Sequence, residues 1–361
     1  MKNYKRLTFK ISKNASNVSY DELLDRLAEL EDKTLWLDSA SVNAQLREAV
    51  RCRVVLRPSP VAERKEVKDP KEIEWMRECH IRDGLAMEKF LYWLERSLAA
   101  GKSISEWDAA VKLGQYRSEI ADYMGDSFET ISAYGKGAAL PHYITPKENA
   151  PLLEPHGLYL CDSGGQYLSG TTDITRTIPL GDCTDEEIRD YTLVLKGHID
   201  LASAIFPAGT PGCRIDAAAR LPLWRNLCNY GHGTGHGVGF FLGVHEGPHQ
   251  IRQNMGPEPL VEGMVTSDEP GIYREGKHGV RHENLLLTVD AGTTEFGSFL
   301  AFETLTLCHF DTSIIDVQLL DRYELEWLNA YNLKVFETLG PLLDEELRQW
   351  LKTKTAPIVL E

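Results

Sequence analysis

The residues best suited to chemistry lie between positions 231 and 283, where histidines and acids alternate with glycine and proline. Glycine lets one backbone segment approach another, or a ligand, closely. Imidazole and carboxylate groups on such a scaffold predict a metal or catalytic site. A glycine-rich loop with solvated histidines is the simpler alternative. The stretch contains Gly231-His232-Gly-Thr-Gly-His236-Gly-Val-Gly, Val244-His245-Glu-Gly-Pro248, Ser267-Asp-Glu269-Pro-Gly and Arg281-His-Glu283-Asn.

Two familiar motifs in this stretch are set aside. His245-Glu-Gly-Pro-His249 has the letters of the zinc-protease motif H-E-x-x-H, which requires a helix. Its interior Pro248 would cost a helix about 3 kcal/mol, so we interpret the match as accidental. Residues 271–277 read G-x-x-x-x-G-K, but the next residue is His278 instead of the Ser or Thr of a phosphate loop, and no strand-then-helix pattern surrounds it.

Two aspartates upstream belong to a predicted hairpin. Residues 158–161 read as a buried strand ending at Asp162, and residues 171–178 read as a second strand. Such a hairpin can bring Asp162 and Asp173 onto neighbouring strands, facing each other. Two facing carboxylates repel, and one keeps its proton unless a cation lies between them. Aspartates that cap turns beside glycine are the alternative interpretation.

These acids and one histidine form a plausible ligand set at predicted strands and glycine turns. Four carboxylates and one imidazole suit manganese, iron or cobalt at two adjacent positions better than a thiolate-rich zinc site does. Two metals roughly 3.5–4 Å apart can lower the pKa of a shared water and give hydroxide near neutral pH. The set comprises Asp162, Asp173, His236, Glu269 and Glu283.

The elements that must position these residues are predicted from caps and periodicity. Asp69 followed by Pro70 predicts the start of a long helix, and Ser105 and Thr184 are further caps. We expect helices at about 70–101, 105–122, 184–205, 215–227, 317–335 and 343–353, and strands at 127–133, 158–162, 171–178, 264–268, 280–288 and 301–309.

Residues 1–68 are expected to form a small preliminary unit. Its predicted elements are a strand at 7–11, a helix at about 19–30 and strands at 34–37 and 53–56. So short a segment with few large apolar residues makes a marginal core. We therefore expect this unit to be incomplete, or docked on the part of the chain after residue 68.

The net charge, the apolar patterning and the cysteine content limit the classes of partner and the cellular location that we expect. The 361 residues carry a net charge of −15, which argues against nucleic acid or an anionic membrane surface as the main partner. There is no apolar run of about 18 residues and no secretory signal, so no membrane association is expected. Seven scattered cysteines without a C-x-x-C pair favour reduced thiols and a cytoplasmic location.

The order Asp162, Asp173, His236, Glu269, Glu283, with the sequence around each, resembles the pita-bread metallopeptidases, which include methionine aminopeptidase, prolidase and aminopeptidase P. The likeness is strongest to the cytosolic-type X-prolyl aminopeptidases and covers residues 70–355. It implies an α+β pita-bread (creatinase/aminopeptidase) fold, in which helices cover a curved, mainly antiparallel sheet. It also implies a catalytic domain at 69–361 with a C-terminal helical extension, after a partial creatinase-N-like α/β domain at 1–68.

The resemblance also implies how the metals are held. Asp162 would bind one metal, His236 and Glu269 the other, and Asp173 and Glu283 would bridge them. Two divalent ions are expected, manganese first, with zinc, cobalt or iron as alternatives. A bridging hydroxide would attack the peptide carbonyl, and Glu269 would take or pass its proton.

Further roles come from the same resemblance. His142 matches a residue that helps to hold the substrate, His245 one that steadies the developing oxyanion, and His232 another histidine on the substrate side. A structural role in a loop is the alternative for each. Arg281 and Tyr273 would orient the metal ligands.

The implied activity is removal of the N-terminal residue from peptides with proline at the second position, by a cytoplasmic homodimer. Two alternatives remain open: prolidase, which cleaves Xaa-Pro dipeptides, and a non-catalytic binding module on the same fold. The sequence departs from the family in one respect, because family members carry a complete N-terminal domain and a complete second domain before the catalytic one.

Overall fold

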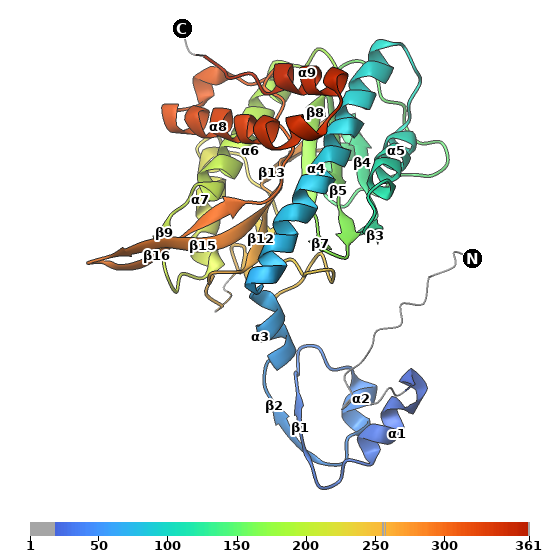
Figure 1. Ribbon diagram of the computed structural model, residues 1–361, viewed down its shortest axis with the longest axis vertical. Coiled ribbons are helices and arrows are strands. Elements are labelled where there is room, and N and C mark those ends of the chain that lie inside the picture. The colour runs from blue at the N-terminus through green and yellow to red at the C-terminus, as the bar shows by residue number, and fades with distance from the viewer. Residues whose placement is uncertain (1–18, 255, 257, 360–361) are drawn as a thin grey trace. The chain divides into compact units, whose positions relative to one another are not determined.

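The computed structural model describes residues 19–254, 256 and 258–359 and divides into two compact units, Met1–Arg64 and Lys65–Glu361 (Figure 1). The strand expected at 7–11 lies outside the described residues. None of the helices in the described part is long and apolar enough to cross a membrane.

The first unit contains two parallel strands with a helix between them. β1 (Thr34–Leu37) pairs with β2 (Arg53–Leu56), and both strands match their predicted bounds. The helix between them, α2 (Ala44–Ala49), is capped by Asn43 and was missed in the sequence. The remaining elements are η1 (Tyr20–Glu22), α1 (Leu23–Ala28) and α3 (Pro60–Glu66), which runs across the boundary between the units.

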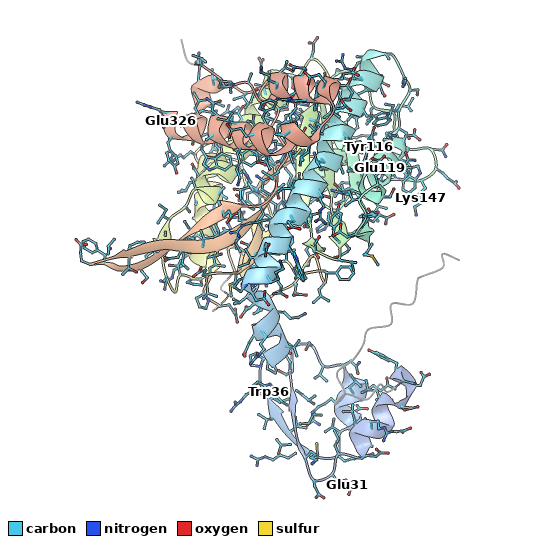
Figure 2. The ribbon with its side chains drawn as sticks, in the orientation of Figure 1. Glu31, Trp36, Tyr116, Glu119, Lys147 and Glu326 are labelled. Carbon is cyan, nitrogen blue, oxygen red and sulfur yellow. The ribbon has the colours of Figure 1, made fainter. Side chains whose placement is uncertain are left out.

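The core of this first unit is thin. Among its described residues only Val50 is buried, and Trp36 on β1 (labelled in Figure 2) is 42% exposed. A segment of this size buries too little apolar surface to gain much stability on its own.

Helices of the second unit begin at the caps expected from the sequence. Asp69, Ser105 and Thr184 each form a reciprocal capping box with the acid three residues later. They start α4 (Pro70–Ala99), α5 (Glu106–Ser118) and α6 (Asp185–Ala202). In Figure 1, α6 lies beside α7 (Asp216–Trp224), and α8 (Arg322–Leu339) and α9 (Glu345–Lys354) lie against α4.

Two antiparallel sheets carry the acids identified in the sequence. In one, β5 (Leu158–Ser163) lies between β4 (Ile131–Tyr134) and β8 (Ile174–Pro179). In the other, the strand order is β12 (Val265–Asp268), β15 (Asn284–Thr294), β16 (Gly297–Thr304) and β9 (Phe206–Pro207). The main apolar core fills the space between these strands and the helices.

Two predicted strands differ from the structure. The single strand expected at 280–288 is two strands, β14 (His278–Arg281) and β15, with a break at His282 and Glu283. The strand expected at 301–309 ends at Thr304. Residues 271–281 form a hairpin of β13 (Gly271–Arg274) and β14, so the phosphate-loop letters lie on a β-hairpin.

Short elements complete the second unit. They are β3 (Tyr123–Asp126), η2 (Gly135–Ala139), β6 (Gly165–Tyr167), β7 (Gly170–Thr171), η3 (Gly212–Arg214), β10 (Gly235–His236), β11 (Gln250–Ile251), η4 (Val317–Leu319) and η5 (Gly340–Leu342).

Candidate metal centre

One cavity of about 310 Å³ gathers all eight residues that the sequence singled out for chemistry. They come from both main sheets and from the loops between them, although up to 141 positions separate them in the chain. The cavity is lined by His142, Asp162, Asp173, His232, His236, His245, Glu269 and Glu283, together with Arg281.

The two aspartates lie diagonally across one face of the β5–β8 pair. Asp162 on β5 is paired with Thr175 on β8, and Asp173 precedes Thr175 by two residues. Because side chains alternate along a strand, both carboxylates lie on the same face. They are therefore diagonal neighbours. The sequence predicted instead that the two aspartates face each other directly across the strands.

The two glutamates occupy matching positions at the end of the other sheet. The last pair between β12 and β15 is Asp268 with Asn284, and Glu269 and Glu283 lie immediately beyond it. The backbone N–H of Glu283 donates to Thr175 O at 3.1 Å, which ties this end of the second sheet to β8. The two carboxylate pairs are thus brought to one place.

His236 reaches the acids because its neighbours are glycines. A Cβ on Gly235 would lie 2.0 Å from Ser267 O, and one on Gly237 would lie 2.1 Å from Glu246 O. Only glycine allows this close approach of β10 to β12. His236 Nδ1 lies 3.0 Å from Gly237 O, which favours a proton on Nδ1. Nε2 lies 3.4 Å from Asp173 Oδ2 and 3.5 Å from Glu269 Oε1, and its lone pair becomes available to a cation once the ring is neutral.

The charges and hydrogen bonds of this cluster fit a bound cation. The ligand atoms of Asp173, His236 and Glu283 all lie within 4.8 Å of one another. Among the described residues, Asp162 Oδ1 and Asp173 Oδ1 are buried without a hydrogen-bond partner. Such orphaned oxygens are costly unless something pairs with them. An oxygen-rich set of this kind suits hard or intermediate divalent ions.

The pKa values of three of these acids and of His236 are also raised, as expected for a buried cluster with too little positive charge. Burial raises the pKa of Asp173 to about 6 and that of Glu269 to about 7. Burial and the neighbouring carboxylates raise the pKa of Glu283 well above its usual value. Burial alone would lower the pKa of His236, but Asp173 and Glu269 outweigh it and raise that pKa to about 9. Divalent cations would remove this repulsion.

A chain of hydrogen bonds leads from Asp162 to His232. Arg281 Nη2 donates to Asp162 Oδ2 at 2.5 Å, and its Nη1 donates to Tyr273 Oη at 2.8 Å. Tyr273 Oη lies 2.7 Å from His232 Nε2. Burial lowers the pKa of His232 to about 4, so the ring is neutral and can accept from the tyrosine.

Two hydroxyl residues in contact with the acids were not identified in the sequence. Thr175 Oγ1 donates to Glu283 Oε2 at 2.8 Å and accepts from Arg281 Nε at 3.2 Å. Ser267 Oγ donates to Glu269 Oε1 at 3.1 Å and accepts from His236 N at 2.9 Å. Thr175 follows Asp173 by two positions, and Ser267 precedes Glu269 by two positions. Residues two apart in an extended chain share a face, and this spacing is the only sequence signal that could have identified them.

The remaining two histidines border the cavity from loops. His142 is exposed in the loop after η2, and His245 is also exposed, with its ring centroid 4.3 Å from that of His236. Burial, and then His236, lower the pKa of His245. An imidazole such as that of His245 can form a hydrogen bond to a substrate.

His249 belongs to the core and not to the cavity. Residues 245–249 form a loop, as Pro248 led us to expect. His249 is fully buried, and its Nε2 lies 3.0 Å from Val265 O. The H-E-x-x-H letters therefore do not bring two histidines to one metal.

The fold and this carboxylate-rich centre are those of the pita-bread class of metallopeptidases. Residues 74–290 match the model of metallopeptidase family M24, and residues 298–358 match the C-terminal region of peptidase_M24. The chain belongs to metallopeptidase family M24, which confirms the resemblance and the fold expected from the sequence.

Two relatives narrow the likeness to X-prolyl aminopeptidases. The chain is 45% identical over 338 residues to a probable Xaa-Pro aminopeptidase P of Coccidioides posadasii. The aligned region covers 91% of this chain and 51% of the relative. The X-prolyl aminopeptidase of Caenorhabditis elegans, a cytosolic enzyme with a di-nuclear active site, superposes with a TM-score of 0.88 at 36% identity, covering 94% of this chain and 57% of that one. The chain thus spans about half the length of the curated relative.

A prolidase is a more distant structural neighbour. The enzyme of Pyrococcus furiosus superposes with a TM-score of 0.63 at 26% identity, covering 80% of this chain and 79% of that one.

Proposed function

We propose that this chain is a metal-dependent X-prolyl aminopeptidase that removes the N-terminal residue from Xaa-Pro-Yaa peptides. One observation carries the proposal: five metal-ligand side chains and three histidines surround a single cavity in a chain 45% identical to a probable Xaa-Pro aminopeptidase P. The complete ligand set disfavours a binding module that has lost its chemistry.

The proposed ligands divide between two divalent ions, with manganese expected. In this proposal Asp162 would hold one ion, His236 and Glu269 would hold the other, and Asp173 and Glu283 would be shared between them. Bound divalent ions supply Lewis acidity and lower the pKa of water. Ser267, Thr175 and Arg281 keep the carboxylates in orientation through the hydrogen bonds described above.

Proton transfer falls to Glu269 in this proposal. Its carboxylate faces the cavity and lies 3.5 Å from His236 Nε2. From that position it accepts the proton of the attacking water and returns it to the leaving nitrogen. The two steps together conserve the proton, so Glu269 ends in its starting state.

The histidines bind the substrate. His245, beside His236, donates a hydrogen bond to the oxygen that becomes negative as the carbonyl is attacked. His142 and His232 lie on the side of the proline. Proline at the second position presents a rigid ring and no N–H, so its shape and the next carbonyl must be recognised. A free α-amino group is required at the metal end.

Prolidase is the second candidate, favoured by the superposition on the enzyme of Pyrococcus furiosus. A panel of peptides separates the two activities by mass spectrometry with manganese added. The panel contains Xaa-Pro-Yaa, its N-acetylated form, Xaa-Ala-Yaa and the Xaa-Pro dipeptide. We expect cleavage of Xaa-Pro-Yaa alone, or nearly so. Cleavage of the dipeptide alone would make prolidase the better assignment.

The panel is run on this chain and on a form extended with the upstream sequence of a full-length relative, because the chain spans about half of the curated relative. We further propose that residues 1–68 are part of a creatinase-N-like α/β domain, that residues 69–361 are the catalytic domain, and that the protein acts as a cytoplasmic homodimer. If neither form cleaves any peptide while binding metal, the binding-module alternative takes over.

A further inference from the structure

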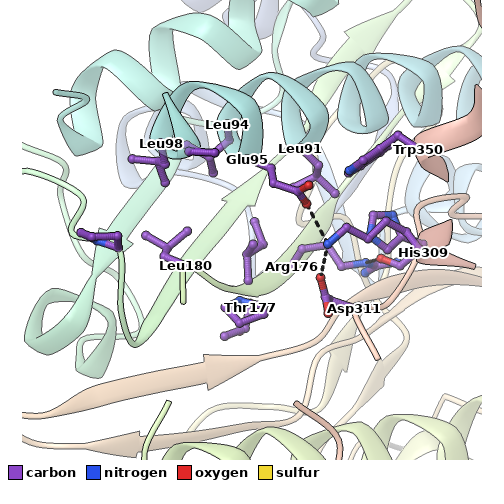
Figure 3. Close-up of a pocket in the computed structure, with 15 residues that line it drawn as sticks. Leu91, Leu94, Glu95, Leu98, Arg176, Thr177, Leu180, His309, Asp311 and Trp350 are labelled. Carbon is purple, nitrogen blue, oxygen red and sulfur yellow. Dashed lines mark hydrogen bonds and ion pairs between the residues drawn. The ribbon is translucent and has the colours of Figure 1, made fainter. Parts of the chain in front are cut away.

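A second cavity, of about 210 Å³, lies between α4, β8 and α9 (Figure 3). Leu91, Leu94 and Leu98 of α4 form one apolar wall, and Leu180, just beyond β8, lies across from them. Consecutive residues of β8 contribute to the two different sites. Thr175 contacts Glu283 at the metal centre, whereas the next residue, Arg176, lines this second cavity. The two cavities share no lining residue.

One buried hydrogen-bond donor at this cavity lacks an acceptor. Trp350 of α9 is 7% exposed, and its indole Nε1–H has no partner among the described residues. In Figure 3 the nitrogen end of the ring points toward Leu91 and the interior of the cavity. A buried donor without a partner costs roughly 1–3 kcal/mol, so an acceptor placed there would be favoured.

The cations at the cavity are already engaged. Lys354 Nζ lies 2.7 Å from Glu95 Oε2 and 3.1 Å from Asp311 Oδ2, and dashed lines in Figure 3 mark these pairs. Arg176 uses Nε, Nη1 and Nη2 in hydrogen bonds within the protein. Its acceptors are His309 O, Thr175 O, Glu283 O, Asn284 Oδ1, Cys308 O and Tyr331 Oη.

These features select the kind of ligand. A carboxylate would find Lys354 paired with two acids and Arg176 saturated, so it would lose its hydration without gaining a charge partner. An ammonium group would find Glu95 and Asp311 already paired with Lys354, and it could not accept the hydrogen bond that Trp350 Nε1–H offers. A neutral oxygen acceptor loses little hydration and satisfies Trp350 Nε1–H.

We propose that this cavity binds a small uncharged molecule with an apolar body and a carbonyl oxygen that accepts a hydrogen bond from Trp350 Nε1–H. The size is adequate, because an apolar cavity of about 150 Å³ already holds benzene. The site is separate from the metal centre and does not depend on the peptidase proposal.

Calorimetric titration with three compounds of matched shape tests the proposal: cyclohexanecarboxamide, cyclohexanecarboxylate and cyclohexylmethylamine. We expect the amide to bind with one-to-one stoichiometry, and the two charged compounds to bind at least about tenfold more weakly. Absence of amide binding, or equal binding of the amide and the carboxylate, would overturn the proposal.

Two variants locate the site. Trp350→Phe keeps an aromatic ring and removes the donor, so amide binding should weaken roughly three- to tenfold. Trp75→Phe, a half-exposed tryptophan of α4 outside the cavity, is the matched control and should not change it. Leu98→Trp fills the cavity and should abolish binding, whereas Leu333→Trp on the exposed face of α8 should not. Unchanged binding in Trp350→Phe and Leu98→Trp would contradict the assignment.

Discussion

Arg281 and Asp162 form a buried ion pair across 119 residues of sequence, with Arg281 Nη2 2.5 Å from Asp162 Oδ2. The pair occupies one oxygen of Asp162 and leaves Oδ1 without a partner among the described residues. The same guanidinium reaches Tyr273 and Thr175. One arginine therefore orients an acid from each sheet: Asp162 directly, and Glu283 through Thr175.

Arg281→Lys should lower activity or metal affinity by about 10- to 100-fold, because lysine cannot donate to Asp162, Tyr273 and Thr175 together. Activity and metal content are measured in parallel. The control is Arg322→Lys on α8, where the arginine side chain is 90% exposed and pairs with Glu326, labelled in Figure 2. Wild-type metal affinity and turnover in Arg281→Lys would refute this role.

Removing either proposed bridging carboxylate should abolish activity and reduce the metal content. Asp173→Asn and Glu283→Gln keep the shape of the side chain but remove a negative charge that bound cations require. Manganese should raise the Tm of the wild-type chain, since a ligand that binds only the native state stabilises it. The shift should be smaller in both variants. Full activity in Asp173→Asn would contradict the ligand assignment.

Loss of His245 should be far more damaging to turnover than loss of His249. His245→Ala should lower kcat about 10²-fold, as expected for the loss of a transition-state hydrogen bond. His249 is fully buried, so glutamine is the suitable replacement. His249→Gln should lower the Tm but retain metal binding and most of the activity. Equal loss of kcat in the two variants would revive the zinc-protease interpretation.

Asp200 on α6 should make stability depend on pH. Burial, followed by the charges of Glu324 and Asp321, raises its pKa to about 6 against the opposing charges of Lys196 and Arg225. Because the folded pKa exceeds the ordinary value of 3.8, folding favours the protonated carboxyl. Its contribution to stability is therefore greatest below about pH 4 and is lost as the pH rises through about 6.

Asp200→Asn removes this penalty and should raise the Tm by about 2 °C at pH 8, allowing for solvent screening of a half-buried group. At pH 4 the two proteins should unfold at the same temperature. Asp182→Asn, at an exposed position, is the control. A Tm difference that is the same at pH 4 and pH 8 would show that the titration of Asp200 is not its cause.

Much of the scaffold could be predicted because its signals are local. Asp69, Ser105 and Thr184 mark helix starts through residues three positions away. The break before β15 could not be predicted, because the turn at Glu283 is fixed by a contact with Thr175, which is distant in the chain. The start of α8 was expected at 317 but is set by the Asp321 cap.

The candidate ligands could be identified because acids and histidines among glycines are uncommon, whereas their supporting hydroxyls could not. Thr175 and Ser267 belong to common residue types, and Thr175 meets Glu283 108 positions away. Trp350 gave no signal either, because an unpartnered indole N–H becomes evident only once α9 is packed against α4 and β8.

The central claim is tested most directly by following one Xaa-Pro-Yaa peptide by mass spectrometry, with manganese and after chelation. The account predicts that the peptide loses a single N-terminal residue only when metal is present, and that the N-acetylated peptide stays intact. An intact peptide in the presence of metal-loaded protein, or cleavage of the acetylated peptide, would contradict it.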